Sequence, residues 1–138
     1  DLDIVYLFNG SHEGESDGRR PLGATLYFNR LAQRVSAALS VPTAQGALYE
    51  VDTRLRPQGT QGPLAASVES FARYQREDAW TWEHMALTRA RVLVGSAASR
   101  AQVEAEIAAV LMRERDPATL RADVLKMRHD MAANKPPR

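Results

Sequence analysis

The chain opens on a nearly unbroken apolar run, Ile4–Phe8, which follows Asp1-Leu2-Asp3. A short run of this kind predicts a strand over residues 1–8 that lies inside a sheet with neighbours on both sides. The segment 47–56 is the other strand candidate and would be one of these neighbours. Because two strands alone make a poor sheet, we expect residues 1–62 to be the later part of a domain whose first elements precede them.

Between the two strand candidates the apolar positions recur at a helical period. A polar loop over 9–21 leads into the segment 22–39, whose apolar positions are Leu22, Leu26, Leu31, Val35 and Leu39. This spacing is close to 3.6 residues and predicts an amphipathic helix. A glycine-containing turn is expected over 58–62, after the second strand.

Beyond that turn the pattern is helical. Helices are predicted over 67–76, over 78–94, over 99–113 and from 117 to a fraying tail at 134–138. Asp78 would cap the second, Ser99 with Gln102 would form a capping box, and Asp116-Pro117 pairs an N-cap with proline at the first helical position. The fold class expected is α+β: a strand–helix–strand sheet over 1–62, then a four-helix bundle over 63–138, mostly α by residue count.

The composition excludes several classes of protein and of binding site. The 138 residues are 44% hydrophobic and 25% charged, which is ordinary for a globular protein. The net charge of +1 gives no case for a non-specific nucleic-acid binder, and no apolar run approaches the ~20 residues of a membrane span. There is no cysteine, so disulfides and thiolate metal sites are excluded. The start has no signal-peptide pattern, and a cytoplasmic protein is expected.

Acidic and basic side chains recur at alternate positions of both strand candidates. Asp1 and Asp3 would share one face of the first strand, and Asp52, Arg54 and Arg56 one face of the second. Carboxylates so spaced can hold two Mg²⁺ ions, and the guanidiniums can contact phosphate oxygens. Two such ions can bind the attacking and leaving oxygens of a nucleoside triphosphate reaction. The pattern therefore indicates nucleotidyl transfer.

Each of these side chains also has a structural interpretation. Asp1 and Asp3 could be surface carboxylates, although an aspartate in so apolar a strand normally needs a partner or a metal ion. Asp52 could form a structural salt bridge with Arg54 or Arg56, and the spacing alone does not decide between the two interpretations.

Other chemistry-bearing residues are expected to be structural. Trp80 and Trp82 should pack between helices, with His84 a hydrogen-bonded structural residue. The turn that contains Gly59 and Gly62 has no Lys-Ser/Thr after it, as a phosphate-binding P-loop requires, so we expect an ordinary turn.

Several longer motifs resemble those of a known family. The run Leu48–Gly59 with Gly62-Pro63-Leu64 resembles the glutamine-synthetase adenylyltransferase/deadenylyltransferase family. Tyr74-Gln75, Ala79–Arg91 and Val124–Arg128 carry the same resemblance. The sequence Ala-Trp-Thr-Trp-Glu-His is similar to the C-terminal, adenylylating half, and the deadenylylating half is the alternative.

The resemblance implies a nucleotidyltransferase domain of the DNA polymerase β type, in which Asp1 and Asp3 match the acidic pair and Asp52 the third acidic residue. The implied reaction transfers AMP from ATP to a tyrosine of glutamine synthetase with Mg²⁺ or Mn²⁺. The implied partners are glutamine synthetase, the P-II signal protein and glutamine as effector. A Gly-Ser motif would precede Asp1 in this family, so we expect the chain alone to be weakly active or inactive.

Two other function classes stay open. A nucleotidyltransferase for a small hydroxyl substrate would use the same carboxylates beside an unrelated helical part. A non-catalytic helical interaction module would use them only structurally.

Overall fold

Strands and helices alternate in the first half of the chain, and helices alone form the second half. The computed structural model describes residues 2–10, 13–47 and 49–134, and its class is α+β, as predicted. The chain divides into two units, Asp1–Tyr74 and Gln75–Arg138. The predicted domain boundary after residue 62 stays a prediction.

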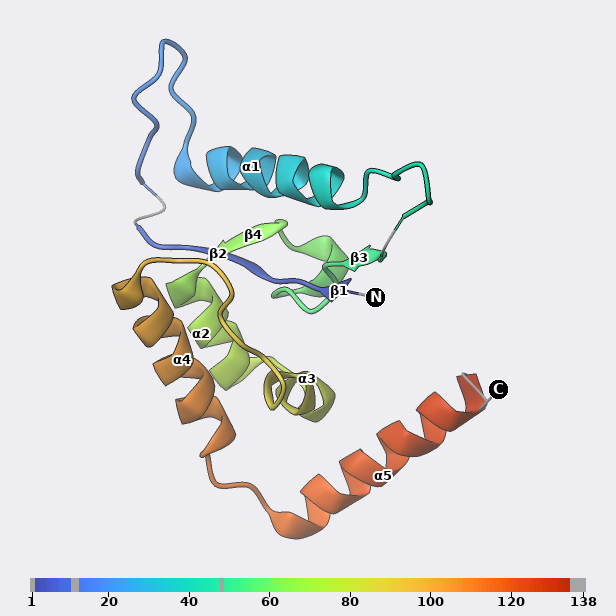
Figure 1. Cartoon of the computed structure of the whole chain (residues 1–138). Coiled ribbons are helices and arrows are strands. Elements are labelled where there is room, and N and C mark those ends of the chain that lie inside the picture. The colour runs from blue at the N-terminus through green and yellow to red at the C-terminus, as the bar shows by residue number, and fades with distance from the viewer. Residues whose placement is uncertain (1, 11–12, 48, 135–138) are drawn as a thin grey trace. The chain divides into compact units, whose positions relative to one another are not determined.

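The elements that begin before the unit boundary include four short strands, and the last of these elements, a helix, crosses the boundary. In order they are β1 (Leu2–Asp3), β2 (Tyr6–Phe8), α1 (Ala24–Leu39), β3 (Val51–Asp52), the 3-10 turn η1 (Gly59–Gln61), β4 (Ala65–Ser67) and α2 (Val68–Glu77). The predicted first strand is thus split in two, and the second, expected over 47–56, is confined to two residues. Figure 1 shows this order along the chain.

The strands pair in two parallel ladders. β1 pairs with β3, with Asp3 opposite Asp52, and β2 pairs with β4, with Phe8 opposite Ser67. Parallel strands need a crossover connection, and α1 supplies it between β2 and β3. The sequence analysis missed β4, because Ala65-Ala66-Ser67 contains no β-branched or aromatic residue.

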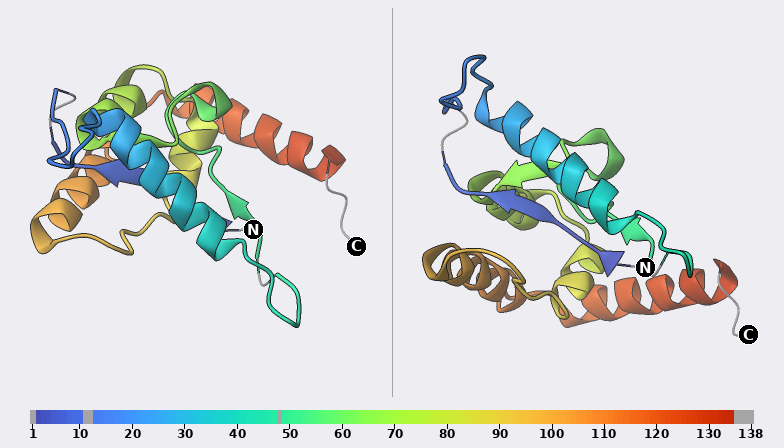
Figure 2. Two further views of the ribbon diagram at one scale, coloured as in Figure 1. Left: turned by 90° about the horizontal axis from the view of Figure 1, so that it is seen from above. Right: turned by 45° about the horizontal axis from the view of Figure 1, so that its top comes forward.

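The core of the first unit lies between α1 and the ladder of β2 with β4. Phe8, Ala32 and Ala65 are buried there, and the Phe8 and Phe28 rings stack with centroids 4.5 Å apart. Figures 1 and 2 show α1 lying over these strands. The helix was predicted correctly, but its buried face was not. The residues expected to face the core are exposed: Leu26, Leu31, Val35 and Leu39.

A polar side chain of α1 holds the start of β4. The Oδ1 atom of Asn29 accepts hydrogen bonds from the backbone N–H groups of Leu64 (2.5 Å) and Ala65 (3.1 Å). The Nδ2 group of Asn29 donates to the carbonyl of Thr25 one turn earlier (2.7 Å), which fixes the orientation of the amide. Asn29 therefore joins α1 to β4 at the edge of the core.

The second unit contains α3 (Thr81–Leu87), α4 (Ala97–Leu111) and α5 (Pro117–Asn134). α3 begins three residues later than expected and ends well before Val94. Its start is held by Glu83, whose carboxylate accepts from the backbone N–H of Trp80 (2.9 Å), so Asp78 is not the cap. Ser96, not Ser99, caps α4 (3.1 Å).

The two tryptophans at the start of α3 do not pack between helices. Trp80 is 71% exposed and Trp82 is 43% exposed, so the expectation of a core role was wrong. The residue of this motif that is buried is Glu83, because its carboxylate caps the helix. Among the described residues, no helix combines the length and the apolar character that crossing a membrane requires.

α5 begins at the N-cap that the sequence predicted. The Oδ2 atom of Asp116 accepts from the hydroxyl (2.6 Å) and the backbone N–H (2.8 Å) of Thr119. These two hydrogen bonds lower the pKa of Asp116 below its ordinary value of 3.8, and the one from the hydroxyl has the larger effect.

Replacing Asn29 should destabilise the first unit. Asn29→Ala leaves the N–H groups of Leu64 and Ala65 without their acceptor, and we expect the free energy of unfolding to fall by about 1–3 kcal/mol. Urea unfolding measures this change. Gln33→Ala, at an exposed position of the same helix, is the control. Equal effects of the two substitutions would show that Asn29 does not hold β4.

The cap of α5 should make the stability of the second unit depend on pH. Because folding lowers the pKa of Asp116, its contribution is present above the ordinary value of 3.8 and is lost as the pH falls through the lower folded value. Asparagine caps helices equally well without a charge. The difference in unfolding temperature between the wild type and Asp116→Asn should therefore shift in favour of the variant on acidification. A difference in unfolding temperature that stays constant as the pH falls below 3.8 would contradict the assignment of Asp116 as the N-cap.

Candidate functional site

Two of the three predicted catalytic carboxylates lie side by side. Asp3 and Asp52 are direct partners in the parallel ladder of β1 and β3, and the N–H of Ile4 donates to the carbonyl of Asp52 (2.8 Å). Side chains of paired residues point to the same face of a ladder, so both carboxylates share one face. The third predicted residue, Asp1, lies outside the described residues.

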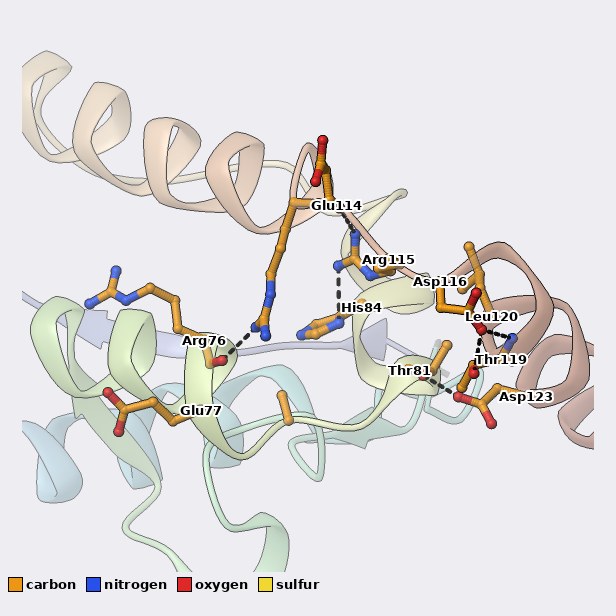
Figure 3. A pocket seen from close by; sticks show the side chains of 12 residues that line it. Arg76, Glu77, Thr81, His84, Glu114, Arg115, Asp116, Thr119, Leu120 and Asp123 are labelled. Carbon is orange, nitrogen blue, oxygen red and sulfur yellow. Dashed lines mark hydrogen bonds between the residues drawn. The ribbon is translucent and has the colours of Figure 1, made fainter.

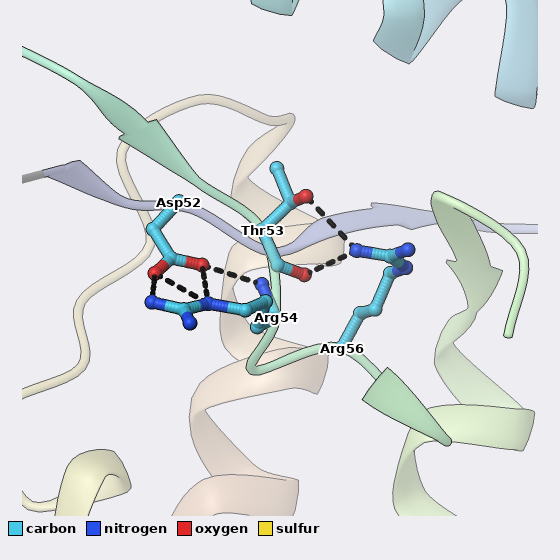
Figure 4. A network of polar contacts seen from close by, with 4 residues as sticks. All are labelled: Asp52, Thr53, Arg54 and Arg56. Atoms are coloured by element: carbon cyan, nitrogen blue, oxygen red, sulfur yellow. Dashed lines mark hydrogen bonds and ion pairs between the residues drawn. The ribbon is translucent and has the colours of Figure 1, made fainter. Parts of the chain in front are cut away.

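The carboxylate of Asp52 is paired with Arg54. Its Oδ1 atom accepts from the backbone N–H of Arg54 (2.8 Å), as in an Asx turn, and both oxygens accept from Nε (3.0 and 2.8 Å). Nη2 of Arg54 completes a bidentate ion pair. Figure 4 shows this fork. The salt bridge that the sequence left open is therefore formed with Arg54.

This pairing shifts the titration of both groups. The side-chain hydrogen bond from Arg54, and after it the backbone one, lower the pKa of Asp52, while the smaller desolvation effect opposes them. The same contact raises the pKa of Arg54, and the charge of Asp3 adds to this rise. Asp52 is thus an ionised carboxylate near neutral pH, which is the form that binds a cation.

Arg56 does not follow the strand geometry expected from the sequence. Because β3 ends at Asp52, Arg54 and Arg56 lie in the turn after it, and the alternation of side chains along a strand does not apply to them. Nη1 of Arg56 donates to the carbonyl (2.8 Å) and the hydroxyl (2.9 Å) of Thr53, and Nε donates to the carbonyl of Gly62 at a longer 3.4 Å.

A hollow of about 340 Å³ opens beside these groups. Its walls come from β3 and the turn after it, and they include Asp52, Thr53, Arg54, Arg56 and Thr60. Its volume is at the lower end of the range for small-molecule sites. Two carboxylates, those of Glu50 and Asp52, and the guanidiniums of Arg54 and Arg56 line this hollow, and this mixture favours an anionic ligand that binds together with a divalent cation.

The donor set suits Mg²⁺ shared with a phosphate ligand. Within residues 2–10, 13–47 and 49–134 there is no group of three or more side chains that could enclose a metal ion. Asp3 and Asp52 nevertheless supply two carboxylates on one face. Mg²⁺ is commonly bound by one or two carboxylates together with phosphate oxygens and waters, so these residues fit such an ion.

The second unit has a hollow of similar size, shown in Figure 3, and several of its charged side chains bond to hydroxyl and backbone groups. Thr81 Oγ1 donates to Asp123 Oδ2 (2.6 Å), and Arg113 Nη1 donates to the carbonyl of Arg76 (2.6 Å). Arg115 donates to the carbonyls of the last turn of α4. These contacts join α3 to α5 and the segment after α4 to the end of α2.

His84 has the structural role that the sequence predicted. Its Nδ1 lies 3.2 Å from Nη2 of Arg115, and its Nε2 lies 2.9 Å from the carbonyl of Gln75. A guanidinium has only donors, so Nδ1 accepts and Nε2 carries the proton. His84 therefore links α3 to the segment before α5.

Sequence reasoning missed the partners of the predicted residues. Arg56 donates to backbone and hydroxyl groups of Thr53 and Gly62, and β4 donates to the neutral amide of Asn29. These acceptors carry no charge, so no pattern of opposite charges in the sequence predicts them. The position of Asn29 beside Phe28, on the face of α1 that also carries Ala32, was the one available signal.

A family model described as glutamate-ammonia ligase adenylyltransferase matches residues 1–106. Proteins named bifunctional glutamine synthetase adenylyltransferase/adenylyl-removing enzyme are similar to the chain over nearly its full length. Those of Brucella suis and Mesorhizobium japonicum are 52% and 47% identical over 139 residues, covering 100% of this chain. That of Agrobacterium fabrum is 49% identical over 99% of the chain. The chain spans 14% of the length of each relative.

Removing the guanidinium of Arg54 should change the titration of Asp52. Arg54→Gln removes the largest cause of the low pKa, and we expect the pKa of Asp52 to rise toward its ordinary value of 3.8. NMR titration of the side-chain carboxyl carbon measures it. Arg30→Gln, which removes the same charge from an exposed position of α1, should leave it unchanged. An unaltered pKa in Arg54→Gln would show that the ion pair does not form in solution.

Proposed function

Because the chain belongs to the glutamate-ammonia ligase adenylyltransferase family, we propose that the protein containing it transfers AMP from ATP to a tyrosine hydroxyl of glutamine synthetase and releases pyrophosphate. The observation that carries this proposal is the register of β1 with β3, which aligns Asp3 with Asp52 beside a hollow lined by arginines. The names of the relatives include both adenylyl transfer and adenylyl removal. The motif from Ala79 to His84 favours the adenylylating half.

The carboxylates have two tasks in this reaction. Asp1, Asp3 and Asp52 would hold Mg²⁺ or Mn²⁺, which neutralises charge on the phosphates and on the leaving pyrophosphate. Asp52 would also accept the proton of the attacking tyrosine hydroxyl, since its carboxylate is ionised at neutral pH. Asp3 and Asp52 reach the same face through the ladder, which supports their joint action.

The two arginines after β3 are the proposed contacts for the triphosphate. The side chain of Arg54 is 73% exposed and that of Asp52 is 16% exposed, so the guanidinium is the partner that is free to turn toward a ligand. Arg56 uses Nη1 and Nε for backbone and hydroxyl acceptors, and within the described residues its Nη2 group makes no hydrogen bond. That group can donate to a phosphate oxygen at the hollow.

The finer points of the fold and the partners belong to the same proposal. Residues 1–62 would form the later part of a polymerase β-type nucleotidyltransferase domain, which the parallel strands joined by α1 support. Residues 63–138 would form a four-helix bundle, and α2, α3, α4 and α5 supply its helices. Glutamine as effector, the P-II signal protein as regulatory partner and a cytoplasmic location complete the proposal.

The decisive variant is Asp52→Asn, in a protein of the relatives' full length that carries this chain. Removing the charge of Asp52 should lower AMP incorporation into purified glutamine synthetase about a hundredfold or more, because cation binding and the position of the nucleophile both suffer. Transfer from labelled ATP with Mg²⁺ or Mn²⁺ measures it. Asp17→Asn, at an exposed loop position, is the matched control.

The outcomes separate the alternatives. Full activity of Asp52→Asn, together with unchanged Mn²⁺ binding, would assign the carboxylates a structural role and favour a helical interaction module. If Asp52→Asn loses AMP removal but still attaches AMP, the chain belongs to the adenylyl-removing half. AMP transfer to small hydroxyl compounds, with none to glutamine synthetase, would point to a small-molecule nucleotidyltransferase.

A further inference from the structure

The loop that follows Asp52 is closed on itself. Between β3 and β4 the backbone N–H of Gly59 donates to the carbonyl of Arg56 (2.9 Å), and that of Gln61 donates to the carbonyl of Gln58 (3.1 Å). Gln58 takes a left-handed conformation with φ of 61°, which non-glycine residues adopt at an energetic cost. A conformation of this kind persists only where the surrounding contacts hold it.

Gly62 permits the close approach of the two arms of the loop. A Cβ atom at this position would lie 2.2 Å from the carbonyl oxygen of Pro57, well inside van der Waals contact. The backbone of Gly62 therefore passes directly over that of Pro57. The geometry of the loop depends on the absence of a side chain at this one position.

The guanidinium of Arg56 joins the two ends of the loop. Its Nη1 group holds the carbonyl and the hydroxyl of Thr53, which directly follows Asp52, and its Nε group holds the carbonyl of Gly62. The planar fork of an arginine can reach several acceptors in a fixed geometry, which a lysine cannot do. The side chain of Arg56 is half-buried in this arrangement.

We propose that Arg56 is a positioning residue that clamps the Thr53–Gly62 loop and thereby holds the carboxylate of Asp52 in place. β3 is only two residues long, and a ladder this short does not fix a side chain by itself. The clamp connects the end of β3 to the segment that enters β4, which is buried beside α1. This role rests on the proposed function, because the placement of Asp52 affects the reaction only if Asp52 takes part in it.

The neighbouring arginine has a different set of contacts. The guanidinium of Arg54 is bonded to the side chain of Asp52, and it makes no bond to the far end of the loop. Its side chain is also largely exposed. Loss of the Arg54 side chain should therefore leave the loop closed, whereas loss of the fork of Arg56 should open it.

A positioning role and a phosphate contact predict different kinetics. If Arg56 acts through the loop, its loss misplaces Asp52, which lowers kcat at a nearly constant KM for ATP. If Arg56 acts only by binding phosphate, its loss weakens ATP binding and raises KM, and the loop stays closed. Hydrogen exchange of the loop amides reports the closure directly and does not depend on activity.

Two substitutions test the clamp in the protein of full length. Thr53→Val removes the hydroxyl acceptor with little change of shape, and Arg56→Lys keeps the charge but loses the fork. In both, the N–H groups of Gly59, Gln61 and Gly62 should exchange about fivefold faster, the effect of losing about one hydrogen bond. The kcat for AMP transfer should fall about tenfold in both variants, since small displacements of reacting groups are costly. In Thr53→Val, which leaves the guanidinium of Arg56 available to a phosphate, the KM for ATP should stay within twofold.

Arg54→Gln is the control for exchange, and it should leave the rates of the loop amides unchanged. Gly62→Ala distorts the loop without touching any charge, and it should reproduce the fall in kcat. Unchanged exchange in both Thr53→Val and Arg56→Lys would overturn the proposal. So would faster exchange with full kcat, or a higher KM for ATP at unchanged kcat.

The same experiment separates this inference from the function on which it rests. If the wild-type protein transfers no AMP, the proposed function fails, and the exchange rates still decide whether the clamp exists. If Asp52→Asn abolishes transfer while the exchange rates do not respond to Thr53 or Arg56, the function stands and the clamp is rejected.

Discussion

The parallel register of β1 with β3 is the constraint on which the site depends, because it sets Asp3 directly opposite Asp52. A shift of one residue would turn one of the two carboxylates to the opposite face of the ladder. Parallel pairing also requires the chain to cross over before it returns, and α1 makes this crossing. The site therefore exists only if the helix packs correctly on the strands.

Short ladders need support from elsewhere, and the first unit supplies it from two directions. On the side of α1, the stacked rings of Phe8 and Phe28 and the amide of Asn29 hold β2 and β4 together. On the side of the loop, Arg56 holds Thr53 and Gly62. Asp52 belongs to the ladder of β1 with β3 and directly precedes this loop, so strand pairing and polar contacts jointly determine its position.

Asp52 also shows that a structural and a functional interpretation need not exclude each other. The bidentate pair with Arg54 is a salt bridge, yet it keeps the carboxylate ionised and places a guanidinium in the wall of the hollow. The same contacts would prepare a site for a cation and a phosphate. Family membership supplies the identity of the proposed reaction, and the geometry supplies the roles of the residues.

Features that depend on near neighbours could be predicted from the sequence alone. The start of α5 follows from Asp116-Pro117, the helical period located α1, and the motifs around Asp52 and His84 identified the family. Tertiary structure decided the rest. β4 forms because the apolar β2 pairs with it, α1 turns Ala32 and Phe28 rather than Leu31 toward the core, and Arg56 finds its acceptors in a folded loop. Helix caps and the periodicity of apolar positions depend on residues a few positions apart, whereas the partner of a strand or the buried face of a helix depends on residues far along the chain.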